Sequence, residues 1–178
     1  MWLLAKAHSL EDRGQKILLL KSSIDTRDGN GVIHSRSLGD RPCTIINPED
    51  DIIKVVSGNQ DIKNPIKFIL VDEAQFLTEK QVEELANIVD FLGINVICYG
   101  LRTDFQTKLF VGSKRLFELA DNIHEIESTC ECGRKTIVNA RIDNDGNVIT
   151  DGEQIEVGGD DRYVALCRKC YYNRKKKK

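Results

Sequence analysis

Two acidic residues follow an apolar run near the middle of the chain. The run spans residues 66–71, and Asp72 and Glu73 come directly after it in the sequence F-I-L-V-D-E-A-Q-F. Open α/β sheets bind their ligands at the carboxyl ends of strands. A carboxylate there can hold Mg²⁺ beside nucleotide phosphates, and a second can take a proton from an attacking hydroxyl. The pair alone is a weak signal, because helix capping or exposure to solvent would also account for it.

A second polar group follows an earlier apolar run. Asp25, Thr26 and Arg27 come shortly after K-I-L-L-L-K at residues 16–21. If the two runs are parallel strands of one sheet, this group lies at the same edge as Asp72. Arginine binds phosphate through paired hydrogen bonds, so we expect Arg27 to lie near phosphates. Without Asp25 and Asp72 as neighbours, Arg27 would be interpreted as a surface residue.

Four of the six cysteines form two close pairs. Cys130-x-Cys132 and Cys167-x-x-Cys170 are separated by 34 residues. Four thiolates in two pairs can close a tetrahedral zinc site with no open position, which is typical of a structural site. The alternative is four unrelated buried thiols. Between the pairs, the glycines at 158 and 159 and Tyr163 suggest either a ligand-contacting loop or a simple hairpin turn.

Helix and strand signals alternate along the sequence around these residues. Capping residues frame one helix, which is expected to begin at Thr78, with Gln81 completing a capping box, and to end at Gly93. Such alternation predicts an α/β fold with a parallel sheet covered by helices on both faces. Apolar spacing predicts further helices over 2–13 and 109–119, strands over 16–21, 66–71, 94–99 and 123–126, and loops over 25–42 and 57–65.

Composition narrows the class of protein. The chain has 178 residues with 40% hydrophobic and 30% charged content and a net charge of −2, values that fit a globular protein without a strong field for nucleic acid or membranes. No apolar stretch reaches the ~18 residues of a membrane span, and the N-terminus does not read as a signal peptide. We therefore expect a cytoplasmic location and reduced cysteines. The basic run at 173–178 reads as a solvated tail, with a nucleic-acid arm as the minor alternative.

Taken together, these segments resemble the zinc-ribbon thymidine kinases of bacteria, animal cytosol and some viruses. The match is collinear over nearly the whole chain, and the C-x-C form of the first cysteine pair is similar to one bacterial branch. It is carried by residues 16–21 with D-T-R at 25–27, L-V-D-E-A-Q-F at 70–76, Y-G-L-R-T-D-F at 99–105, C-E-C-G-R-K at 130–135, G-E-Q-I-E-V-G-G-D-D-R-Y at 152–163 and C-R-K-C-Y at 167–171.

The resemblance implies an activity and a fold. The activity is transfer of the ATP γ-phosphoryl group to the 5′-hydroxyl of thymidine or deoxyuridine in nucleotide salvage for DNA synthesis. The fold is a P-loop-NTPase-like (RecA-like) α/β domain over 1–128, a small β-rich zinc-ribbon and lasso domain over 129–172, and a basic tail over 173–178. It also implies structural Zn²⁺, Mg²⁺ with ATP, feedback inhibition by dTTP and a homotetramer.

Site residues carry over from the resemblance one by one. Glu73 is implied as the general base on the 5′-hydroxyl. A lasso around Gly158 is implied to fold over the nucleoside. The nucleotide side is implied to contain Asp72, Arg27, Asp25 and Gln75, the nucleoside side Leu101, Phe105, Ile155, Val157, Gly158 and Tyr163, and the zinc site Cys130, Cys132, Cys167 and Cys170.

One family feature does not occur in this sequence. The family begins with a strand and a phosphate loop of the form G-x-x-x-x-G-K-[ST], which is found nowhere in the chain. Two interpretations follow: the natural protein begins further upstream and is an active kinase, or the chain is a shortened and inactive relative. We favour the first, because Glu73, Phe105 and the four cysteines are all retained.

Other function classes share single features with the chain. A zinc-ribbon nucleic-acid-binding protein would account for the cysteines and the basic tail. A helicase would account for D-E-A-Q, but the chain is too short for two helicase domains.

Overall fold

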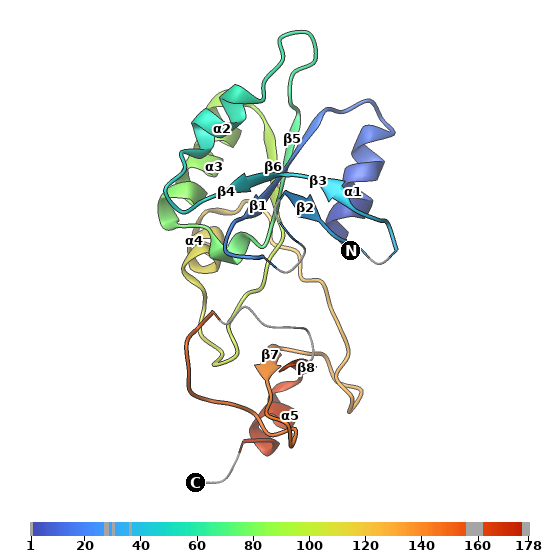
Figure 1. The fold of residues 1–178 in the computed structure, drawn as a ribbon, viewed down its shortest axis with the longest axis vertical. Coiled ribbons are helices and arrows are strands. Elements are labelled where there is room, and N and C mark those ends of the chain that lie inside the picture. The colour runs from blue at the N-terminus through green and yellow to red at the C-terminus, as the bar shows by residue number, and fades with distance from the viewer. Residues whose placement is uncertain (1, 27–28, 30, 36, 156–161, 176–178) are drawn as a thin grey trace. The chain divides into compact units, whose positions relative to one another are not determined.

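The structure is a computed structural model that describes residues 2–26, 29, 31–35, 37–155 and 162–175. The chain divides into two compact units (Figure 1). The first contains residues 1–101 and 111–120, and the second contains residues 102–110 and 121–178.

The first unit is built on a parallel sheet of four described strands in the order β4-β1-β5-β6. These strands are β4 (Thr44–Ile46), β1 (Ile17–Ser22), β5 (Phe68–Asp72) and β6 (Asn95–Cys98). The two central strands pair with Ile17 opposite Phe68 and with Lys21 opposite Asp72. The predicted parallel α/β sheet is therefore confirmed, and the polar ends of β1 and β5 lie side by side.

Helices cover both faces of this sheet. On one face, α1 (Trp2–Glu11) packs Leu3 and Ala7 against Leu19 and Leu70. On the other, α2 (Ile52–Gly58) and α3 (Glu79–Leu92) pack against the alternate residues of the same strands, with Leu116 of α4 (Val111–Leu119) at the border of the cluster. Strand residues buried on both faces explain the continuous apolar runs in the sequence.

The capping signals of α3 are confirmed. The Thr78 hydroxyl accepts from the N–H of Gln81 at 3.2 Å, while the Gln81 side-chain oxygen accepts from the N–H of Thr78 at 3.1 Å. Gly93 follows the helix in the left-handed conformation with φ 64°. These residues fix where the helix that follows the acidic strand end begins and stops.

Several sequence-based boundaries were wrong. Residues 123–126 were predicted as a strand, but Ile123 and Ile126 are exposed and pair with no described strand. Neither β4 nor α2 was predicted, and the predicted loop over 57–65 begins inside α2, which runs to Gly58. The predicted loop over 25–42 contains the short antiparallel pair β2 (Val32–Ile33) and β3 (Arg41–Pro42), and α1 ends at Glu11 rather than at 13.

The second unit has few regular elements. Strands β7 (Val138–Arg141) and β8 (Tyr163–Leu166) form an antiparallel pair, and α5 (Arg168–Asn173) follows. Its buried cluster is small and includes two of the four cysteines that were predicted to bind a metal. The members are Cys130, Val138, Ala140, Val148, Leu166, Cys167 and Tyr171.

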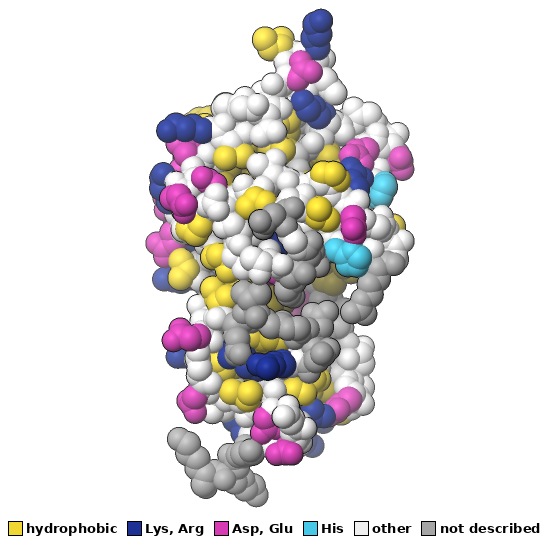
Figure 2. Space-filling view, viewed as in Figure 1, with side chains coloured by type: hydrophobic (Ala, Val, Ile, Leu, Met, Phe, Trp, Pro, Cys, Tyr) yellow, Lys and Arg dark blue, Asp and Glu magenta, His cyan; other side chains and the backbone are white. Residues whose placement is uncertain are grey.

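Acidic and basic side chains are interspersed on the face shown in Figure 2, as the near-zero net charge leads one to expect. Within the described part of the chain, no helix combines the length and the apolar character that crossing a membrane requires.

Candidate functional site

A buried lysine near the end of β1 pairs with one carboxylate and lies opposite a second one at the end of β5. Lys21 is fully buried, and its Nζ is 3.1 Å from Asp25 Oδ2 and donates to the carbonyl of Val32 at 3.3 Å. Lys21 is the register partner of Asp72, which is also buried. Asp25 and Asp72 were predicted to lie at the same edge of the sheet, and the positively charged side chain of Lys21, which was not predicted there, lies beside them. A lysine that ends an apolar strand four residues before an aspartate was the available signal.

The protonation of Asp72 is finely balanced. Burial and the neighbouring Glu73 carboxylate together raise the pKa of Asp72 to about 6, against the opposing effects of the Glu73 N–H and of Lys21. The carboxylate is thus ionised at neutral pH, although it lies largely out of water. A divalent cation bound there would favour the ionised form, so the site suits a metal that arrives with a polyphosphate.

Glu73 is held in an unusual backbone conformation. Its φ of 51° and ψ of 40° place it in the left-handed region, which few residues other than glycine adopt. This conformation turns the chain from β5 into the 3-10 helix η1 (Ala74–Phe76). The Gln75 side chain donates to Glu73 Oε2 over 2.5 Å. Strain of this kind persists where surrounding structure imposes it and is frequent at active sites.

The turn η1 is packed against two glycines. A Cβ on Gly100 would lie 2.6 Å from Gln75 Oε1, and a Cβ on Gly112 would lie 2.7 Å from the carbonyl oxygens of Ala74 and Leu77. Both distances are shorter than real carbon contacts, so only glycine fits at either position. The close approach fixes the segment that carries Glu73.

Leu101 is anchored through its backbone on the same side of the unit. Its N–H donates to Gln75 Oε1 at 3.0 Å, and its carbonyl accepts from Ser113 Oγ at 2.6 Å. The Leu101 side chain is exposed. A rigid backbone with an exposed apolar side chain is suited to one wall of a ligand pocket.

The second unit contains an aromatic cluster built on Arg141. The Arg141 guanidinium carbon lies 4.0 Å from the centre of the buried Phe105 ring. Its Nε and Nη2 donate to the Tyr163 hydroxyl at 3.1 and 3.0 Å, and Nη2 also donates to the Glu153 carbonyl. The Tyr171 hydroxyl donates to the Phe105 carbonyl at 2.9 Å. Phe105 and Tyr163, predicted separately, are thus brought together by an arginine that the sequence analysis missed.

A hydrogen-bonded turn joins the Phe105 segment to residues 152–154. The buried Asp104 accepts from the N–H groups of Gln106 and Lys108 at 2.9 Å and from the Gln154 side chain at 2.8 Å. This positions the beginning of the proposed lasso, where Ile155 is exposed. Val157 and Gly158 were also predicted there, but they lie outside the described residues, as does Arg27.

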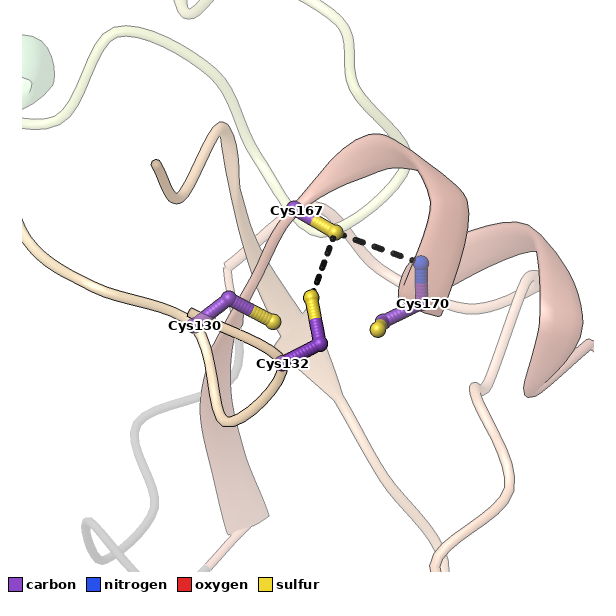
Figure 3. A group of neighbouring side chains, drawn as sticks. All are labelled: Cys130, Cys132, Cys167 and Cys170. Atoms are coloured by element: carbon purple, nitrogen blue, oxygen red, sulfur yellow. Dashed lines mark hydrogen bonds between the residues drawn. The ribbon is translucent and has the colours of Figure 1, made fainter. Parts of the chain in front are cut away.

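The four predicted metal-ligating cysteines converge (Figure 3). All four sulfurs lie within 4.8 Å of one another, with Cys132 and Cys167 3.5 Å apart. Zn–S bonds of about 2.3 Å in a tetrahedron give sulfur separations of about 3.8 Å, so the quartet matches zinc. Gly133 turns the first pair with φ 79°, and Cys167 caps the start of α5.

The pKa shifts of the four cysteines also favour a metal site. Backbone N–H groups of Cys132 and Cys167 lower the pKa of Cys130 to about 7, whereas the neighbouring thiols raise that of Cys170 to about 12. Without a cation the four sulfurs cannot all be ionised together. The arrangement is therefore suited to a divalent metal that binds thiolates.

Comparison with known proteins gives a consistent match. A family model described as "Thymidine kinase" matches residues 1–171. Thymidine kinase of Zymomonas mobilis is 46% identical over 167 residues, which cover 94% of this chain and 86% of the relative. The enzyme of Rhodopirellula baltica is 43% identical over 93% of this chain and 78% of its own length, and that of Salmonella choleraesuis is 40% identical over 95% and 82%.

Proposed function

The chain belongs to the thymidine kinase family, and from this we propose that it is a thymidine kinase that transfers the ATP γ-phosphoryl group to the 5′-hydroxyl of thymidine or deoxyuridine. The observation that carries the proposal is the buried, strained strand end in which Asp72 and Glu73 are adjacent. Phosphoryl transfer needs positioned charges and a base more than covalent chemistry, and this strand end supplies both.

We assign the proton-transfer step to Glu73. Its carboxylate would accept the proton of the 5′-hydroxyl as that oxygen attacks the γ-phosphorus. The bond from the γ-phosphorus to the β–γ bridging oxygen would break, and ADP would leave. Asp72 and Asp25 would hold Mg²⁺, which neutralises phosphate charge when it is bound with ATP. Lys21 supports this role because it balances the two buried carboxylates. Arg27 and Gln75 complete the proposed nucleotide side.

The nucleoside side is proposed from two sets of residues. Leu101 would contact the base as an apolar wall, and Phe105 would stack on it. Tyr163, Ile155, Val157 and Gly158 would belong to a lasso that covers the nucleoside. The hydrogen bonds of Arg141 to the Tyr163 hydroxyl and the Glu153 carbonyl support this reading, because they tie the two ends of that loop to the Phe105 ring.

We propose zinc for the cysteine quartet, in a structural role. By family analogy we also propose a homotetramer inhibited by dTTP, in the cytoplasm, where thiols remain reduced.

Replacement of Glu73 tests the proposal. Glu73→Gln keeps the side-chain shape but cannot accept the proton, so kcat for thymidine should fall by about 10²- to 10⁴-fold, while thymidine still protects the protein against thermal unfolding. Glu49→Gln, at an exposed glutamate, is the matched control and should leave kcat unchanged. Full activity in Glu73→Gln would exclude this glutamate as the base. If single-stranded oligonucleotide but not thymidine protects the wild type against thermal unfolding, the proposal that the protein is a kinase is wrong.

A further inference from the structure

We infer that Gln75 is a positioning residue that couples the general base Glu73 to the nucleoside-contacting backbone at Leu101. The inference rests on the proposed kinase function and adds a role to one of its residues. Sequence analysis placed Gln75 beside the nucleotide, which stays a prediction. The contacts of its side chain point to a task inside the protein.

Both ends of the Gln75 amide are used. The side chain is 2% exposed, its Nε2 donates to Glu73 Oε2 at 2.5 Å, and its Oε1 accepts from the Leu101 N–H at 3.0 Å. One planar group therefore sets the direction of the base carboxylate and the position of the pocket backbone. A shift at either end is transmitted to the other, because the amide is rigid.

The packing around Gln75 leaves it little freedom. A Cβ at Gly100 would lie 2.6 Å from Gln75 Oε1 and 3.0 Å from its backbone nitrogen, so the chain of residues 99–101 lies directly against the amide. The Ala74 N–H donates to the Tyr99 carbonyl at 2.9 Å, which holds the same two segments together. A Cβ at Gly112 would lie 2.8 Å from the carbonyl oxygen of Gln75.

This arrangement gives the hydrogen bond to Glu73 a specific consequence. A donor to one carboxylate oxygen restricts the rotation of the Glu73 side chain, so its other oxygen points in a defined direction. A general base must lie within hydrogen-bond reach of the hydroxyl that it deprotonates, and errors of about 1 Å can cost about 100-fold in rate. Gln75 thus acts on the reaction through Glu73, without needing to touch substrate.

Two substitutions separate the two ends of the amide. Gln75→Glu keeps an oxygen that accepts from Leu101 but removes the donor to Glu73, so kcat should fall by about 10- to 100-fold with thymidine KM within about two-fold of wild type. Gln75→Met removes both contacts, so kcat should fall similarly and KM should rise about five-fold or more.

Gln81 provides a matched control. It is also a glutamine exposed by only 2%, and its side chain donates to the carbonyls of Asn47 and Asp50 and accepts from the N–H of Thr78, away from Glu73. Gln81→Met should lower the melting temperature and leave kcat and KM within about two-fold of wild type. If the Gln75 variants lose only stability, as the control does, the positioning role is wrong.

Amide hydrogen exchange tests the coupling without using activity. Exchange at Leu101 should accelerate about ten-fold or more in Gln75→Met and stay at the wild-type rate in Gln75→Glu, with β5 protected in both. An unchanged rate at Leu101 in Gln75→Met overturns the inference whether or not the chain phosphorylates thymidine. Failure of the wild type to bind thymidine, with the expected exchange pattern, instead overturns the proposed function. If Gln75→Met fails to fold, Gln75→Glu decides through kcat alone.

Discussion

The two units hold their polar groups by different physical means. In the first, Lys21, Asp25 and Asp72 are fixed by a parallel sheet whose register places strand ends together, and Glu73 is fixed by a turn pressed against two glycines. In the second, Cys130, Cys132, Cys167 and Cys170 converge from two turns on a cluster of seven buried residues. A core of that size contributes little stability, so such a unit needs a cross-link.

Because the two units are stabilised differently, they should unfold under different conditions. The first should keep its fold without any ligand, because its helices and strands bury apolar side chains on both faces of the sheet. The second should depend on its metal. Experiments that remove one support at a time test this difference.

The largest expected effect is loss of zinc. A strong chelator at neutral pH should remove exchange protection from β7 and β8 while leaving that of β5, because zinc binding contributes about 10–16 kcal/mol in small cysteine sites. Cys167→Ser should do the same, whereas Cys43→Ser, at a cysteine outside the quartet, should not. Hydrogen exchange with metal analysis is the measurement. Clearly less than one zinc per chain, or equal loss in both units, would contradict the contrast.

The next effect concerns Asp72 and has a defined pH dependence. Its pKa is raised to about 6 from 3.8, so the folded state binds the proton more tightly than the unfolded state does. Stability should therefore fall as pH rises from about 4 to about 6 and stay lower above that. Asp72→Asn should be more stable than wild type at pH 8, by up to about 3 kcal/mol, and equally stable below pH 4.

Urea unfolding across this pH range measures the difference. The opposite-sign control is Asp51, whose pKa is lowered chiefly by the N–H of Lys54, so Asp51→Asn should not gain stability at pH 8. A variant at 72 that is less stable than wild type at pH 8 would mean that the charge of Asp72 stabilises the fold.

A smaller effect should follow from filling the space beside η1. Gly112→Ala should lower the unfolding free energy by about 1–3 kcal/mol, because its Cβ would meet three backbone oxygens at 2.7–2.8 Å. Gly58→Ala, where nothing lies within 4 Å, should be neutral or slightly stabilising. Chemical denaturation compares the two. Equal stabilities would show that the turn is not confined as closely as proposed.

The smallest effect is expected at Arg141. Arg141→Met should raise thymidine KM by about 2- to 30-fold, which corresponds to about 0.5–2 kcal/mol for the lost contact with Phe105, and should leave zinc content unchanged. Arg174→Met, which removes a surface ion pair with Glu131 in the same unit, is the control and should change KM little. An unaltered KM in Arg141→Met would separate the aromatic cluster from nucleoside binding.

Local signals in the sequence were sufficient to predict some of the helices and strands and the metal site. The capping box at Thr78, the apolar runs of β1 and β5, and the cysteine spacing each depend on neighbours in the chain, so they could be predicted. Arg141 could not, because its contact with Phe105 joins segments that are far apart in the sequence. Lys21 offered only one local signal, an aspartate four residues later, and it was not used. The short β4 leaves too little periodicity to detect. The apolar residues within 123–126 have the spacing of a strand but pair with no strand in the described part of the chain.

Because the backbone of Glu73 is left-handed, stability and the proposed activity favour different residues at position 73. Glycine there would relieve a strain of about 1–3 kcal/mol and abolish the proposed base. A library of variants selected only for abundance should therefore enrich glycine or asparagine at residue 73, whereas one selected for growth on thymidine should retain glutamate. The position where the two selections diverge most would then mark the base without any knowledge of the structure.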